Sequence, residues 1–127
     1  MPERSLRDRH ILIVEDEYML ADELRCAFGD AGGTILGPVG TVPDALALIK
    51  REGRIEGAVL DVNLRGDMAF PVADLLVERG VPFVFTTGYD ESVIPDRFSK
   101  ILRCEKPIAV DGIMRALGRL IERTAPQ

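Results

Sequence analysis

The segment His10–Glu17, with the sequence HILIVEDE, runs from a continuous apolar stretch directly into three acids. Apolar residues that are continuous, rather than alternating with polar ones, are typical of a strand buried on both faces of a parallel sheet. The same pattern recurs where Ala58–Leu60 is followed at once by Asp61. These stretches predict buried strands that carry acidic side chains directly after their carboxyl ends.

Helical patterns alternate with the apolar runs along the rest of the chain. Apolar residues in 17–31 recur at three- and four-residue steps, as they do on the buried face of a helix. We expect strands at 10–14, 34–39, 58–60, 82–86 and 100–103, and helices at 17–31, after Thr41, at 71–79 and at 110–121. We also expect a polar loop at 62–67 and a short helix within 90–99. This alternation predicts a doubly wound α/β domain with a parallel sheet and helices on both faces. The domain is expected to span 10–124, after a frayed N-terminus at 1–9.

Composition excludes several classes of function. The 16 Lys and Arg residues stand against 21 Asp and Glu residues, a formal net charge of −5, which disfavours binding to nucleic acid or to an anionic membrane surface. No apolar run approaches the roughly 20 residues of a membrane helix, and the charged N-terminus does not resemble a signal peptide. Cys26 and Cys104 are too few for a disulfide framework, and His10, the single histidine, disfavours a zinc site. We therefore expect a cytoplasmic protein.

Polar side chains follow four of the expected strands. Ligands of such sheets bind beyond the carboxyl ends of the strands, so these residues are expected to lie together. They are Glu15 and Asp16, then Asp61, then Thr87, and finally Lys106. Crowded carboxylates repel unless a cation joins them, and Mg²⁺ is the usual hard cation of phosphate chemistry. A carboxylate there can attack phosphorus, while an ammonium and a hydroxyl bind the phosphoryl oxygens.

In this order the motifs resemble those of response regulator receiver domains. The matching stretches are ILIVEDE at 11–17, LDVNL at 60–64, TGY at 87–89 and KP at 106–107. The resemblance implies the flavodoxin-like strand order 2-1-3-4-5, with Asp61 as the phosphoacceptor. It also implies that Asp16 and Asp61 ligate Mg²⁺ by side chain, Asn63 by its backbone carbonyl and Glu15 through water. Thr87 and Lys106 would bind the phosphoryl group.

One departure from the common receiver pattern points to a subgroup. Arg103 stands where most receivers carry a switch aromatic, whereas aromatics surround the threonine in FVFTTGY at 83–89. This stretch is similar to the motif of the FAT GUY subgroup, with Thr86 in place of alanine, and it makes Tyr89 the candidate switch. The resemblance implies as partners a sensor histidine kinase of the HWE type, or a phosphotransfer protein, and a downstream protein. A homodimer through the fifth strand and the last helix is a further expectation.

Two further features of the site are expected from the sequence. Glu17 is interpreted as an exposed acid in the first turn of a helix. The peptide between Lys106 and Pro107 is expected to be cis, which costs little before proline and turns the lysine towards Asp61.

Three other interpretations remain open. A phosphatase of the haloacid dehalogenase type also uses an Asp at the end of a buried strand, but it needs an acid where this chain has Asn63. A flavodoxin-like FMN protein needs a Ser, Thr and Gly-rich phosphate loop where this chain has acids. A receiver that serves as a scaffold without phosphorylation is disfavoured by the intact set of site residues.

Overall fold

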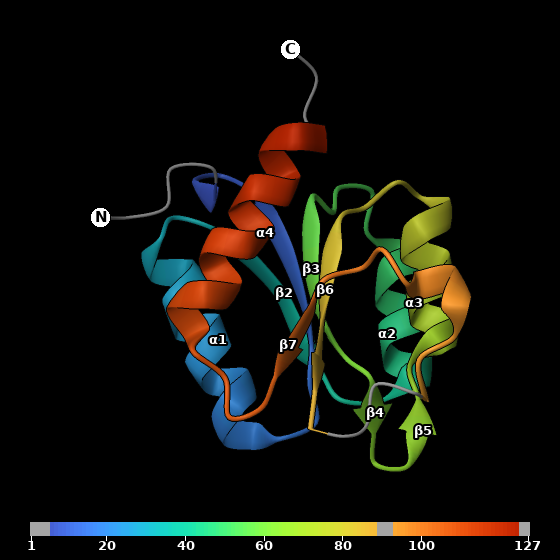
Figure 1. Ribbon diagram of the computed structural model, residues 1–127. Coiled ribbons are helices and arrows are strands. Elements are labelled where there is room, and N and C mark those ends of the chain that lie inside the picture. The colour runs from blue at the N-terminus through green and yellow to red at the C-terminus, as the bar shows by residue number, and fades with distance from the viewer. Residues whose placement is uncertain (1–5, 89–92, 125–127) are drawn as a thin grey trace.

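A five-stranded parallel sheet forms the centre of the domain (Figure 1). The computed structural model describes residues 6–88 and 93–124. The sheet contains β1 (His10–Val14), β2 (Thr34–Val39), β3 (Gly57–Asp61), β6 (Phe83–Thr87) and β7 (Arg103–Glu105). Its order is β2-β1-β3-β6-β7, with every neighbouring pair parallel. The predicted fold class and strand order are therefore confirmed.

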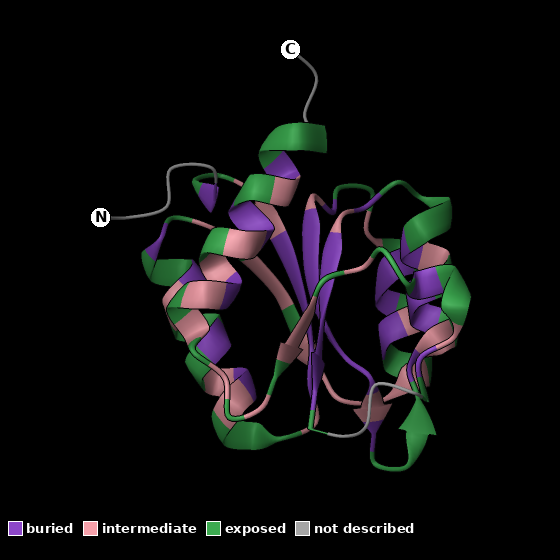
Figure 2. Cartoon of the chain, in the orientation of Figure 1, coloured by how far each residue is buried: buried purple, intermediate pink, exposed green. Residues whose placement is uncertain are grey.

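Helices cover both faces of the sheet and enclose two cores (Figure 1). One face carries α1 (Tyr18–Asp30) and α4 (Val110–Thr124), and the other carries α2 (Val42–Arg51) and α3 (Phe70–Glu78). Figure 2 shows the central strands buried and the outward helix faces exposed. At β3, a Cβ on Gly57 would lie only 2.8 Å from Ile121 Cδ1 of α4, so a larger residue there requires the end of the Ile121 side chain to shift. No helix in residues 6–88 and 93–124 is long and apolar enough to cross a membrane.

A small hairpin replaces the polar loop that we expected at 62–67. β4 (Asn63–Leu64) pairs antiparallel with β5 (Asp67–Met68) around the two-residue turn Arg65–Gly66. Both turn residues have positive φ, 55° and 92°, as in a type I′ hairpin turn. For a non-glycine residue this backbone conformation costs about 1–2 kcal/mol. The loop prediction was wrong because strands of two residues are too short to show a hydrophobic period.

The N-terminal boundary also differs from the prediction. Residues 6–9 were expected to be frayed, but Leu6 is fully buried in the core between the sheet and the helices α1 and α4. The backbone N–H of Asp8 donates to the carbonyl of Gly32 at 2.9 Å. The backbone N–H of Thr34 donates in turn to the carbonyl of Arg9 at 2.8 Å. A buried apolar side chain and these backbone hydrogen bonds attach the segment to the domain.

The fifth strand begins later than the sequence predicted. We expected 100–103, whereas β7 begins at Arg103, which pairs with Phe85. Before it, the short 3₁₀ helix η3 (Asp96–Phe98) packs beside α3, where Phe98 stacks on Phe70 with 5.8 Å between ring centroids. The apolar side chain of Ile101 thus belongs to the loop that leads from η3 into the sheet, and not to the strand itself.

Candidate functional site

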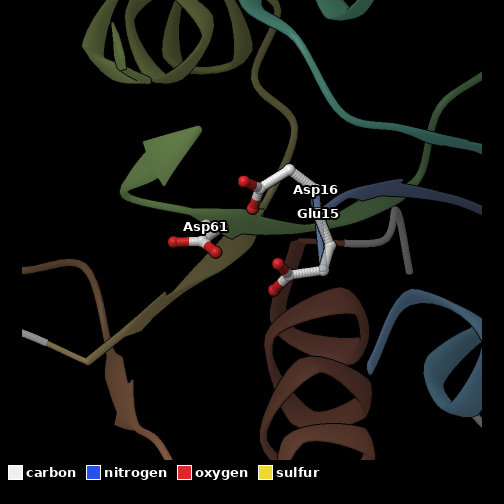
Figure 3. A group of neighbouring side chains, drawn as sticks. All are labelled: Glu15, Asp16 and Asp61. Carbon is white, nitrogen blue, oxygen red and sulfur yellow. The ribbon is translucent and has the colours of Figure 1, made fainter. Parts of the chain in front are cut away.

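Three acids gather at the carboxyl edge of the sheet, from two neighbouring strands. Glu15 and Asp16 follow β1, and Asp61 is the last residue of β3. One carboxylate oxygen from each lies within 4.8 Å of the others, and Figure 3 shows the three side chains around a shared space. Glu15 and Asp61 are buried, at 3% and 4% exposure, while Asp16 is half-buried. The edge is therefore a strongly acidic and poorly solvated place.

Lys106 supplies a positive charge to this cluster. Its Nζ lies 2.8 Å from Asp61 Oδ2 and 3.3 Å from Glu15 Oε1. The loop after β7 is fixed by a hydrogen bond from the Lys106 backbone N–H to the carbonyl of Thr87, at 2.8 Å. The peptide between Lys106 and Pro107 is cis, as predicted. Burial opposes the charge of Lys106, but the hydrogen bond and attraction to Asp61, followed by those to Glu15, outweigh it and raise the lysine pKa.

Glu17 is exposed, as predicted, but its side chain also belongs to the site, which the sequence analysis missed. Its Oε2 lies 3.5 Å from Lys106 Nζ, and its backbone N–H donates to Glu15 Oε2 at 3.0 Å. Glu17 stands at the N-cap position of α1, yet its side chain makes no capping hydrogen bond. Its position directly after two site acids was the available signal, but a carboxylate at a helix start is favoured by the helix dipole alone.

The electrostatics of the acids are those of a cation site. Burial, followed by a hydrogen bond with Asp61, raises the pKa of Glu15 to about 8. Two carboxylates this close disfavour each other's ionisation, and a bound cation relieves that repulsion. Clustered carboxylate oxygens are the donors that Mg²⁺ prefers. The residues present therefore fit the hard divalent cation that the sequence predicted.

A cavity of about 430 Å³ opens over Asp61. It is lined by Asp16, Glu17, Asp61, Asn63, Arg65, Gly66, Gly88 and Lys106. The backbone N–H of Asn63 donates to Asp61 Oδ1 at 3.0 Å, so both carboxylate oxygens of Asp61 accept a hydrogen bond. The arrangement holds one carboxylate in a fixed orientation at the floor of an open cavity, which suits a nucleophile.

The remaining predicted site residues lie at different places. Thr87 is buried at the end of β6, beside the loop that carries Lys106. Arg103 lies in β7 and lines a separate groove of about 620 Å³ between that strand and α4, rather than the cavity over Asp61. Tyr89 lies outside the described residues.

Comparisons with known proteins place this fold and site. No family model matches the chain, and no curated protein matches it. Among solved structures, a response regulator receiver protein from Sinorhizobium medicae WSM419 is 23% identical with a TM-score of 0.79, covering 94% of this chain and 99% of that one. At this identity the likeness shows the fold.

Two other solved structures share a higher sequence identity with this chain. SdrG from Sphingomonas melonis Fr1 is 40% identical with a TM-score of 0.77, covering 91% of this chain and 98% of SdrG. A BeF3-activated conformation of SdrG, from Pseudomonas melonis Fr1, is 42% identical with a TM-score of 0.71, covering 88% of this chain and 95% of that one. The chain belongs to the response regulator receiver domains of two-component signalling, the CheY-like family. A receiver is a regulatory phosphoacceptor rather than an enzyme that acts on a separate substrate. Membership in this family sets aside the phosphatase and flavodoxin interpretations.

Proposed function

We propose that this chain accepts a phosphoryl group on Asp61 from a phosphohistidine of a sensor histidine kinase or a phosphotransfer protein, and thereby changes its affinity for a downstream protein in the cytoplasm. The observation that carries this proposal is the fixed carboxylate of Asp61. Asn63 and Lys106 hold its two oxygens at 3.0 and 2.8 Å, at the floor of a cavity open to a donor.

The transfer is a displacement at phosphorus. An oxygen of Asp61 forms a bond to the phosphorus atom while the phosphorus–nitrogen bond of the phosphohistidine breaks, and that bond's electron pair stays on the imidazole nitrogen. Lys106 neutralises charge on a phosphoryl oxygen, because its ammonium already lies at the Asp61 carboxylate. Thr87, at the end of the neighbouring strand, donates a hydroxyl hydrogen bond to the product. Hydrolysis of the acyl phosphate then resets the site.

A divalent cation belongs to this proposal. Asp16 and Asp61 would hold Mg²⁺ by their side chains, Asn63 by its backbone carbonyl, and Glu15 through water. When bound, the cation supplies positive charge to the transferring oxygens. The support in this chain is the cluster of three carboxylates, whose oxygens lie within 4.8 Å of one another.

The switch is proposed to follow the FAT GUY subgroup. Arg103 replaces the usual aromatic of the fifth strand, so Tyr89, two residues after Thr87, is proposed to reorient when Thr87 moves towards the phosphoryl group. An activated conformation of SdrG exists with BeF3, which supports a phosphorylation-driven change in a similar protein. In Tyr89→Ala, phosphorylation should persist while the change in partner affinity shrinks. A mutant that keeps the full affinity change contradicts this role.

The partners are proposed from the same resemblance. The phosphoryl donor would be a kinase of the HWE type.

The chain is also proposed to form a homodimer through β7 and α4. Sedimentation of the protein with and without BeF3 tests the dimer, because only an activation-dependent dimer changes its mass. An unchanged monomer contradicts it.

The phosphoacceptor is tested with a small donor. The protein is incubated with Mg²⁺ and phosphoramidate, and intact mass is measured for the wild type, Asp61→Asn and Asp67→Asn. We expect one phosphoryl group on the wild type and on Asp67→Asn, whose changed carboxylate is exposed on the hairpin, and none on Asp61→Asn. An unmodified wild type favours the scaffold interpretation, and a modified Asp61→Asn overturns the assignment.

A further inference from the structure

The β4–β5 hairpin carries a residue that its turn does not favour. Positive φ at both turn residues suits Asn, Asp or Gly in the first place and Gly in the second. Gly66 satisfies the second place, whereas Arg65 occupies the first with φ of 55°. The turn is otherwise well made, because Asn63 Oδ1 accepts the Gly66 N–H at 2.7 Å and Leu64 is buried. An unfavoured residue in a well-made turn points to a role of its side chain outside the hairpin.

Arg65 lies where two cavities meet. The cavity of about 430 Å³ over Asp61 adjoins another of about 520 Å³ between the start of α1 and the end of β2. Asp16 and Arg65 are the two residues that line both. Lys106 lines the cavity over Asp61 but not the adjoining one, and it follows β7, the edge strand farthest from β2. Arg65 and Lys106 thus approach the space over Asp61 from its two sides.

The acids around Asp61 are paired with Lys106 and not with Arg65. The carboxylates of Asp61, Glu15 and Glu17 already share the Lys106 ammonium, at 2.8, 3.3 and 3.5 Å. Arg65 forms no ion pair with any residue in 6–88 and 93–124. Arg25, the other arginine of the adjoining cavity, is paired with Asp22 at 2.6 Å. A phosphoryl group entering this acidic cavity therefore finds one guanidinium, that of Arg65, which has no ionic partner among the described residues.

We propose that Arg65 binds the phosphoryl group during its transfer to Asp61, contacting phosphoryl oxygens from the Asp16 side while Lys106 contacts them from the other. This inference rests on the proposed function of Asp61. The planar guanidinium matches two phosphate oxygens, which a point charge such as an ammonium does not. Arg65 takes part in no bond change: the Asp61 oxygen–phosphorus bond forms, the donor's phosphorus–nitrogen bond breaks, and the electron pair leaves with the donor.

The turn itself supplies a sharp test. Arg65→Asn removes the guanidinium but places a favoured residue in the turn, so the variant is expected to fold at least as well as the wild type. Phosphorylation by phosphoramidate is followed at saturating Mg²⁺ over a range of donor concentrations. The apparent second-order rate constant is expected to fall about tenfold in Arg65→Asn, with partial recovery in Arg65→Lys. Arg25→Gln, which removes an equal charge from the adjoining cavity, is expected to react at the wild-type rate.

Each outcome decides the question. A slow Arg65→Asn with an undiminished melting temperature supports a contact with the phosphoryl group, because a structural role predicts the opposite stability change. An Arg65→Asn that reacts as fast as the wild type overturns the inference while leaving Asp61 as the phosphoacceptor. The inference is also overturned if the loss appears only with a kinase as donor, because Arg65 then contacts the kinase. A wild type that accepts no phosphoryl group overturns both proposals.

Discussion

The ammonium of Lys106 lies 2.8 Å from Oδ2 of Asp61, a contact that joins the loop after β7 to the end of β3. The Asp61 side chain is buried, so this hydrogen-bonded ion pair compensates a charge that is poorly solvated. The same carboxylate is a proposed ligand of the divalent cation. Lys106 and the metal thus both interact with the Asp61 carboxylate, and a variant without the lysine shows the effect of the metal alone.

Lys106→Gln is expected to weaken the metal-free fold and to strengthen cation binding. Without the ammonium, the acids at Asp61 and Glu15 lose their compensating charge, at a cost of about 1–3 kcal/mol in the free energy of unfolding. Mg²⁺ then binds carboxylates with no competing cation, so its affinity should rise. Urea unfolding with and without Mg²⁺, together with a Mg²⁺ titration, measures both effects. Lys100→Gln, at an exposed position, is the control, and a lower Mg²⁺ affinity in Lys106→Gln would contradict the competition.

Asp16→Ala tests the metal ligand that is not shared with the lysine. Asp16 lines the cavity over Asp61 and offers an oxygen to the cluster, but it makes no ion pair with Lys106. Loss of one anionic ligand should lower Mg²⁺ affinity about tenfold or more with little change in stability. Amide shifts followed during a Mg²⁺ titration give the affinity. Asp22→Ala removes a half-buried carboxylate from the adjoining cavity, and equal affinities of the two variants would reject the assignment.

The sequence could predict the fold and the main site residues for one physical reason. Parallel strands bring their carboxyl ends to one edge, so residues that follow buried runs, such as Asp61 and Lys106, must meet there. The role of Glu17 could not be predicted in this way, because it depends on where the end of a long lysine side chain comes to rest. The β4–β5 hairpin was missed because its pairing is set by turn geometry rather than by a hydrophobic period.

Thr86→Val is expected to stabilise the domain. Thr86 is fully buried in β6, and its Oγ1 has no hydrogen-bond partner among the described residues. A buried hydroxyl without a partner costs about 1–3 kcal/mol, and valine has the same shape without that cost. Urea unfolding should show a gain of about 1 kcal/mol. Thr34→Val, at an exposed position of β2, is the matched control. A loss of stability in Thr86→Val would show that the hydroxyl is satisfied in solution.

The opposite end of the sheet carries a carboxylate that should govern stability in acid. Glu56 precedes β3, and its Oε1 accepts the backbone N–H of His10 at 3.0 Å. The side chains of Arg9 and Arg54 donate to the same carboxylate at 3.0 and 2.9 Å. Burial acts to raise the pKa of Glu56, but these hydrogen bonds outweigh it, and the pKa is lowered.

A lowered pKa fixes the sign of the pH dependence. The folded state binds a proton on Glu56 less readily than the unfolded state, so this stabilisation is complete above the unfolded pKa of about 4.3 and is lost as the pH falls through the lower folded value. Glu56→Gln should reduce the free energy of unfolding by about 1–2 kcal/mol at neutral pH, and its stability should fall less steeply in acid. Urea unfolding across this range measures the slope. Glu122→Gln, an exposed position without an ion pair among the described residues, should keep the wild-type slope. If Glu56→Gln keeps it too, the acid sensitivity arises from other carboxylates.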